Sequence, residues 1–210
     1  PVKTISIPKV EADDVIAYLS KSVITHPKDK SFIVSSDKDF LQLVDENVVV
    51  YRPMEKEYYT PQTVIDKYKL SPHNFILHKT LLGDNSDKIK GVKGLGEKGL
   101  LKKFPELIEK DMSWGDILNI CEEKISEHLV YARIIHGRDD LEKNYKIMDL
   151  SNPMLSKEDK IWLDEIVASD NLPYYPDQFV SMYNEDQIGG LIRNVEFWVK
   201  DCFNNLVIKK

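Results

Sequence analysis

The sequence predicts an α/β core with a parallel sheet, followed by a mostly helical region. Two observations predict the core: short runs of β-forming residues recur, and residues at helical spacing follow the first two runs. A third observation, the change to helical patterning after Tyr58-Tyr59-Thr60-Pro61, predicts the second region. Alternating strands and helices form parallel sheets through right-handed crossovers. We therefore expect a partial core over 1–60, a helical region over 61–145 and a helical carboxy-terminal region over 146–210.

Three segments of the core are predicted strands, and two helices follow them. The strands are Val2–Ile7, Ser31–Ser35 and Val48–Tyr51, and the helices are Glu11–Lys21 and Asp37–Val44. In an open parallel sheet, ligands bind beyond the carboxyl ends of the strands. Acidic residues follow the first two predicted strands, so we expect a site at this edge of the sheet.

The second region should begin with a helix that Thr60 caps, with Pro61 at the first helical position. A second helix, Pro72–Leu82, should end at Gly83, because glycine is the commonest residue just past a helix end. A glycine-rich turn then enters a helix at Gly99–Phe104. Helical patterning resumes at Trp114, with breaks at three proline-containing pairs, Asn152-Pro153, Leu172-Pro173 and Tyr175-Pro176.

The composition is that of a soluble globular protein, with 42% hydrophobic and 30% charged residues in 210. No run of eighteen apolar residues occurs, and the start lacks the features of a signal peptide, so we expect a cytoplasmic protein without a membrane partner. Cys121 and Cys202 are far apart and lack metal-ligand spacing. This excludes a disulfide framework and a zinc site of the usual Cys/His pattern.

The net charge of -6 argues at first against a nucleic-acid partner, because affinity for phosphate comes mainly from lysine and arginine. The charges are unevenly distributed, however. Between Lys79 and Lys103 there are seven lysines and three acids, a balance of +4, whereas Asp139–Lys210 has a balance of -6. The basic stretch is therefore a candidate nucleic-acid interface.

Seven carboxylates lie in three short clusters along the chain. Like charges this close raise one another's pKa values unless cations compensate. Mg²⁺ and Mn²⁺ prefer carboxylate oxygens, and a pair about 4 Å apart can activate a water for phosphodiester hydrolysis. The alternative is that Glu11 and Asp37 cap helices and that the other acids are solvated. The candidate ligands, and candidate catalytic residues, are Glu11, Asp13 and Asp14; Asp37 and Asp39; Asp84 and Asp87.

Asp84 and Asp87 are separated by three positions. They would share one face if a helical turn continued past Gly83. The glycine-rich turn that follows has the form of a helix-hairpin-helix, in which glycines let the backbone approach a phosphate and amides of the next helix hold it. The alternative is a purely structural connection between helices. The candidate DNA-binding residues are Lys88, Lys90, Gly91, Val92, Lys93, Gly94, Leu95, Gly96, Lys98 and Lys102.

Three motifs together resemble the 5′-nuclease, or flap endonuclease, superfamily. They are Glu-Ala-Asp-Asp opening a helix, Ser-Ser-Asp-x-Asp-Phe-x-Gln-Leu at a strand end, and Leu-Leu-Gly-Asp-x-x-Asp-x-Ile-x-Gly-Val-x-Gly-Leu-Gly-x-Lys. They occur in the family's order over roughly residues 5–104. Met148-Asp149-Leu150 and Asn171-Leu172-Pro173 look most like the T-even phage ribonuclease H type. The family's amino-terminal half, with its helical arch, has no counterpart in this sequence.

The resemblance implies a PIN-like core, a helix-three-turn-helix DNA-binding segment and cleavage of 5′ ends, flaps and RNA primers with two Mg²⁺ ions, for which Mn²⁺ can substitute. It assigns Glu11, Asp13, Asp14 and Asp37 to the first metal and Asp39, Asp84 and Asp87 to the second. It also implies a K⁺ ion at the hairpin. The expected partners are branched or 5′-ended duplex DNA, RNA–DNA primer junctions, a separate amino-terminal half and replication proteins. The alternatives are a non-catalytic DNA-binding module and a PIN-type ribonuclease.

Overall fold

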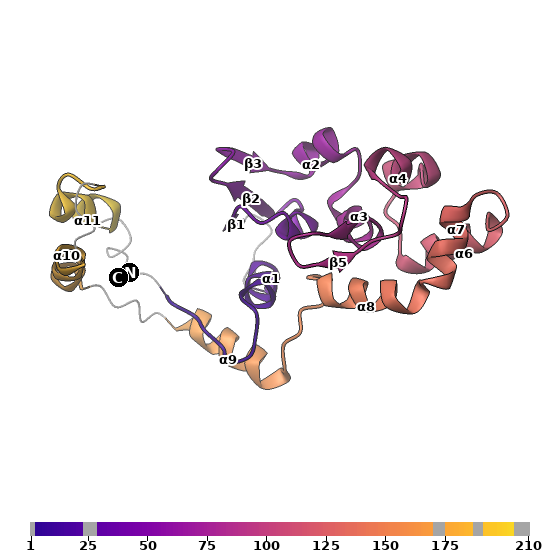
Figure 1. The fold of residues 1–210 in the computed structure, drawn as a ribbon. Coiled ribbons are helices and arrows are strands. Elements are labelled where there is room, and N and C mark those ends of the chain that lie inside the picture. The colour runs from indigo at the N-terminus through magenta and orange to yellow at the C-terminus, as the bar shows by residue number, and fades with distance from the viewer. Residues whose placement is uncertain (1–2, 23–28, 170–174, 187–190, 204–210) are drawn as a thin grey trace. The chain divides into compact units, whose positions relative to one another are not determined.

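The computed structural model describes residues 3–22, 29–169, 175–186 and 191–203 (Figure 1). The chain forms two compact units, Lys9–Lys160 and a smaller one made of Pro1–Pro8 with Ile161–Lys210. All predicted site residues belong to the larger unit. Among the described residues, no helix has the length and apolar character needed to cross a bilayer.

The predicted α/β core is confirmed. Strands β1 (Ser31–Val34) and β2 (Val48–Arg52) pair in parallel, and β3 (Glu57–Tyr59), which the sequence did not predict, adds an antiparallel edge. Helix α1 (Ala12–Ser22) follows the apolar spacing expected for it and buries Val15 and Ala17. The core of this layer gathers apolar side chains of α1, the sheet and the segments around it, including Ala17, Ile33, Val48, Val50 and Tyr59.

Two predictions for the core are wrong. Residues 3–7 form no strand, and Val2 lies outside the described residues. Their side chains do alternate in exposure, but strand formation also requires a neighbouring strand to accept the backbone hydrogen bonds. Instead of an α-helix, Asp39–Leu43 forms a short 3₁₀-helix, η1. The reason is local: the Asp37 carboxylate accepts a hydrogen bond from the Asp39 amide at 2.9 Å, which tightens the entry into the turn.

The helical region begins as predicted. Helix α2 (Pro61–Tyr68) has Thr60 as its N-cap, and α3 (Phe75–Leu82) follows the 3₁₀-turn η2 (Pro72–Asn74) and ends at Gly83. The strands β4 (Gly83–Asp84) and β5 (Ile89–Lys90) form a short antiparallel ladder that the sequence did not predict. The helices that follow are α4 (Glu97–Lys103), α5 (Glu106–Glu109), α6 (Trp114–Glu123), α7 (Leu129–His136) and α8 (Arg138–Met148).

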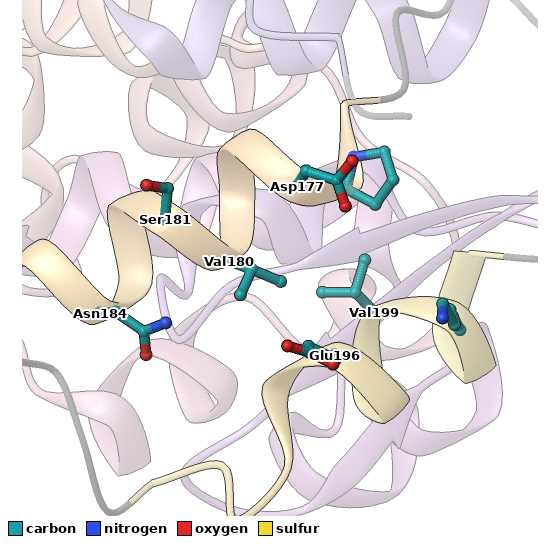
Figure 2. A pocket seen from close by; sticks show the side chains of 8 residues that line it. Asp177, Val180, Ser181, Asn184, Glu196 and Val199 are labelled. Atoms are coloured by element: carbon teal, nitrogen blue, oxygen red, sulfur yellow. The ribbon is translucent and has the colours of Figure 1, made fainter.

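The carboxy-terminal part continues with α9 (Lys157–Ala168), α10 (Pro176–Glu185) and α11 (Val195–Phe203). The predicted breaks at Asn152-Pro153 and Tyr175-Pro176 are confirmed, and Leu172-Pro173 lies outside the described residues. Figure 2 shows Val180 of α10 and Val199 of α11 at a cavity of about 370 Å³ in the smaller unit. None of the predicted site residues lines this cavity.

A buried asparagine fixes the start of α3. The Asn74 side chain is fully buried, donates to the carbonyl oxygens of Leu107 at 2.9 Å and Lys110 at 2.8 Å, and accepts from the Met112 amide at 2.9 Å. Asn74→Leu keeps the approximate volume but leaves three backbone groups without this partner. We expect it to lower the free energy of unfolding by about 3 kcal/mol, measured by urea denaturation, whereas the exposed Asn152→Leu should change it by less than about 0.5 kcal/mol.

Candidate metal centre

Three of the predicted acidic residues converge in the larger unit. Asp39 lies at the first position of η1, separated by residues 35–38 from the carboxyl end of β1, and Asp84 and Asp87 lie on the β4–β5 hairpin. One carboxylate oxygen of each residue lies within 4.8 Å of those of the other two. Because hard divalent cations prefer such oxygen ligands, this donor set suits Mg²⁺ or Mn²⁺.

The hairpin, rather than a helix, brings Asp84 and Asp87 together. Helix α3 stops at Gly83, as predicted, and the φ of 80° at Gly83 ends the helical path, so no helical turn places the two carboxylates on one face. The chain instead turns over residues 85–88, where Asp84 Oδ1 accepts from the Ser86 amide at 2.8 Å and from the Ser86 hydroxyl. This local turn orients the Asp84 carboxylate without help from a helix.

Gly91 has a different role from the one expected. A side chain at this position would place its Cβ 2.1 Å from the carbonyl carbon of Leu82 and 2.3 Å from its oxygen. Gly91 therefore lets the segment after β5 lie directly on the end of α3. Gly94 adopts φ 81°, which favours glycine, whereas a Cβ at Gly96 would meet nothing within 4 Å.

Lys79 is the functional residue that the sequence analysis missed. Its ammonium group makes ion pairs with Asp39 and, at 2.8 Å, with Asp84, although Lys79 is only 6% exposed. A lysine on an apolar, buried helix such as α3 requires an anionic partner, because an unpaired charge there is costly. That mismatch between residue type and helix is the sequence signal that could have identified it.

The two carboxylates beside Lys79 differ in their electrostatics. Burial raises the pKa of Asp39 to about 6, even though the hydrogen bond from Lys79 acts in the opposite direction. For Asp84, hydrogen bonds from Lys79 and Ser86 hold the pKa well below its usual range. Burial tends to lower the pKa of Lys79, but its bonds to Asp39 and Asp84 outweigh burial and raise it. All three groups are therefore charged at neutral pH.

The first predicted cluster lies near this group. Burial, followed by the charges of Asp37, Glu11, Asp14 and Asp87, raises the pKa of Asp13, so these carboxylates share one electrostatic environment. Asp14 also has a structural contact, since its Oδ1 accepts from the Met154 amide at 2.8 Å. Glu11, Asp13, Asp14 and Asp37 do not join the three-oxygen group of Asp39, Asp84 and Asp87 in the described part of the chain.

An open cavity of about 690 Å³ adjoins the acidic group. Asp39 and Asp84 lie in its wall, and its rim also carries hydroxyl and basic groups. The buried Arg52 donates to the Ser36 carbonyl oxygen at 2.8 Å, which fixes the segment between β1 and Asp37. The lining residues are Ser35, Ser36, Asp37, Lys38, Asp39, Arg52, Asp84 and Ser86.

The predicted helix-hairpin-helix runs from the end of α3 to α4 and includes the β4–β5 ladder; we call residues 83–102 the hairpin segment, or the hairpin for short. Five of its lysines, on β4–β5, the glycine-rich turn and α4, are exposed: Lys88, Lys90, Lys93, Lys98 and Lys102. The side chains of Val92 and Leu95 are instead buried in the helical core, so only their backbone can face a ligand. Arg133 of α7 donates to the Lys93 carbonyl oxygen at 2.7 Å and so ties the hairpin to the helical region.

Comparisons with known proteins find similarity to 5′-3′ exonucleases. Residues 1–69 match the family described as 5′-3′ exonuclease, N-terminal resolvase-like domain. The chain is 36% identical over 166 residues to a 5′-3′ exonuclease of Aquifex aeolicus, covering 75% of this chain and 52% of that protein. It is 35% identical over 141 residues to the thermostable DNA polymerase I of Thermus thermophilus, covering 62% of this chain and 16% of that protein. The chain thus spans about half the length of the A. aeolicus relative.

The fold is also similar to solved structures. A bacteriophage T5 5′-exonuclease with bound zinc ions has a TM-score of 0.65 and 22% identity, over 78% of this chain and 61% of that chain. A T5 flap endonuclease in complex with DNA and metal ions has the same TM-score, with 21% identity over the same shares. The predicted resemblance to the 5′-nuclease superfamily and the PIN-like fold are confirmed, while the finer likeness to the T-even type stays a prediction. Over residues 1–69 this chain matches the 5′-3′ exonuclease family, and over 166 residues it is similar to a 5′-3′ exonuclease.

Proposed function

We propose that the protein is a magnesium-dependent 5′-nuclease that cleaves 5′ ends, flaps and RNA primers of duplex DNA during replication. The observation that carries the proposal is the convergence of Asp39 of η1 with Asp84 and Asp87 of the β4–β5 hairpin, which precedes a row of exposed lysines. The names of the relatives, 5′-3′ exonuclease and DNA polymerase I, support the same activity.

In the proposed reaction the carboxylates would hold the metal ions and the lysines would bind the DNA. When bound, the divalent ions would activate a water and neutralise the leaving oxygen of the phosphodiester. The carboxylates of Asp39, Asp84 and Asp87 would hold the ions, with Glu11, Asp13, Asp14 and Asp37 as the nearby first-site group. The exposed lysines of the hairpin would bind the phosphates of the duplex and position the 5′ end at the open cavity.

The test uses this chain alone and together with a polypeptide corresponding to the rest of the relatives' length. Each is incubated with end-labelled 5′-flap duplex, blunt duplex and single-stranded RNA, in Mg²⁺, Mn²⁺ or a chelator. We expect cleavage of the flap substrate in Mg²⁺ and in Mn²⁺, with none in the chelator. Cleavage restricted to single-stranded RNA would favour a PIN-type ribonuclease instead. Salt-sensitive duplex binding without cleavage in either ion would favour a DNA-binding module.

The hairpin lysines should carry a measurable part of the affinity for duplex. Replacing Lys93, Lys98 and Lys102 together by alanine should weaken flap binding and reduce the slope of log Kd against log salt by up to about three. Fluorescence anisotropy at several salt concentrations measures both quantities. A control variant with Lys30, Lys56 and Lys110 replaced, which are exposed outside the hairpin, should retain most of the slope. An equal loss in both variants would contradict a hairpin interface.

Three further parts of the proposal concern a K⁺ ion, a second polypeptide and the cellular setting. We propose that K⁺ binds at the hairpin backbone and that a polypeptide corresponding to the rest of the relatives' length completes the enzyme. We also propose that the protein works in the cytoplasm alongside a replicative polymerase. The presence of this family's sequence within DNA polymerase I supports a replication partner.

A further inference from the structure

Lys79 lies among the proposed metal ligands, but its protonated side chain cannot bind a metal. Its side chain is 7% exposed, and it bridges Asp39 and Asp84 from the last part of α3. A protonated lysine offers three hydrogen-bond donors and no acceptor. Its ammonium group therefore occupies the position beside these carboxylates that a bound divalent cation would need.

Both oxygens of Asp84 already have donors. Oδ2 pairs with Lys79 at 2.8 Å, and Oδ1 accepts from the Ser86 amide and hydroxyl. Asp39 also gives one oxygen, Oδ1, to Lys79. A divalent ion bound by both carboxylates would lie a few ångströms from the ammonium group, and the like charges would repel each other strongly at such a distance.

We propose that Lys79 is an internal counter-ion that competes with the divalent ion for Asp39 and Asp84. Its ammonium group holds the two carboxylates together and releases at least one of them when the divalent ion binds. This inference rests on the proposed function, because it requires Asp39, Asp84 and Asp87 to bind that ion. Lys79 is thus a positioning residue, which sets the affinity of the site without serving as a ligand.

Thermodynamic linkage predicts the sign of the change in divalent-ion affinity when Lys79 is replaced. Suppose that the ion pairs of Lys79 and the bound divalent ion exclude each other. The divalent ion then weakens the ion pairs by some factor, and removing the ammonium group must strengthen binding of the divalent ion by the same factor. A lysine that only supports the fold would instead leave the ion affinity unchanged or weaker. The sign of the change in affinity therefore separates the two roles.

The experiment is a calorimetric titration of the full chain with Mn²⁺ at pH 8.5, comparing the wild type with Lys79→Met. Methionine has a similar length and no charge. We expect Lys79→Met to bind Mn²⁺ about tenfold more tightly, within the usual range of coupling between two sites. Lys79→Arg, which retains the charge, should bind close to the wild-type value. Lys38→Met removes a lysine from the rim of the same cavity and should change the affinity less than about threefold.

A measurement on the wild type covers the case in which Lys79→Met does not fold. The side-chain ammonium signal of Lys79 in a ¹H–¹⁵N spectrum should shift or broaden when Mg²⁺ is added. An unshifted signal at saturating Mg²⁺, or Mn²⁺ affinity that Lys79→Met leaves unchanged or reduces, would overturn the proposal. If the wild type binds Mn²⁺ no better than Asp84→Asn with Asp87→Asn, the metal site of the proposed function itself fails.

Discussion

Replacing Asp84 and Asp87 together by asparagine should reduce Mg²⁺-dependent cleavage of a 5′-flap duplex by about a thousandfold or more. Both side chains belong to the group whose oxygens lie within 4.8 Å of one another. Asparagine keeps the size of each side chain but removes two negative charges, so the remaining Asp39 could not retain a divalent ion. Because Lys79 keeps its ion pair with Asp39, we expect the double variant to remain folded.

Single-turnover cleavage rates at saturating enzyme would measure this loss separately from DNA binding. The matched control is Asp139→Asn with Asp140→Asn, which neutralises two exposed carboxylates at the start of α8. It should cleave within about threefold of the wild type. Equal rates for the wild type and the Asp84 and Asp87 double variant would rule out the metal centre described above.

Gly91→Ala should destabilise the protein by about 4 kcal/mol and abolish divalent-ion binding. The new Cβ would lie 2.1 Å from the carbonyl carbon of Leu82, and both clashing groups belong to the backbone, so no side-chain movement can relieve the contact. The segment after β5 must then separate from α3. Asp84 and Asp87 lie on the β4–β5 hairpin, so their alignment with Asp39 should be lost with it.

Gly96→Ala is the matched control within the same turn. A Cβ at Gly96 would have no heavy atom within 4 Å, and the backbone there is extended, with φ -121°. We expect less than about 1 kcal/mol of change in unfolding free energy and normal Mn²⁺ affinity. Thermal denaturation with and without Mn²⁺ measures both effects. Similar losses for the two variants would mean that flexibility of the whole turn, rather than the contact with Leu82, matters.

The sequence allowed much of the core to be predicted because its signals are local. The β-forming run at Ser31–Ser35, the N-cap at Thr60 and the helix end at Gly83 depend on neighbouring residues, and each is found where expected. The strand predicted at Val2–Ile7 failed because pairing depends on a partner elsewhere in the structure. The β4–β5 ladder was missed because strands of two residues have no periodicity to detect.

The candidate site was also predictable only as far as its signals are local in the sequence. Spacing and charge identified the three acidic clusters, but only the structure shows that Asp39, Asp84 and Asp87 meet, and that they do so through a hairpin. Lys79 was counted with the basic stretch, since a sequence does not show which lysine turns inward. Val92 and Leu95 were grouped with the DNA-binding turn, although their side chains are buried in the helical core.

The η1 segment that carries Asp39 has a consequence for biosynthesis. The Gln42 side chain donates to the Met148 carbonyl oxygen and accepts from the Leu150 amide, both at 3.0 Å, across 106 and 108 residues of sequence. At elongation rates of about 5–20 residues per second, the ribosome needs on the order of 5–20 s to make the chain between these partners. Once Asp87 has been made, the nascent chain contains all the acidic ligands, but η1 still lacks its hydrogen bonds to Met148 and Leu150. Competence to bind the metal should therefore arise late in synthesis, only after the end of α8 has emerged.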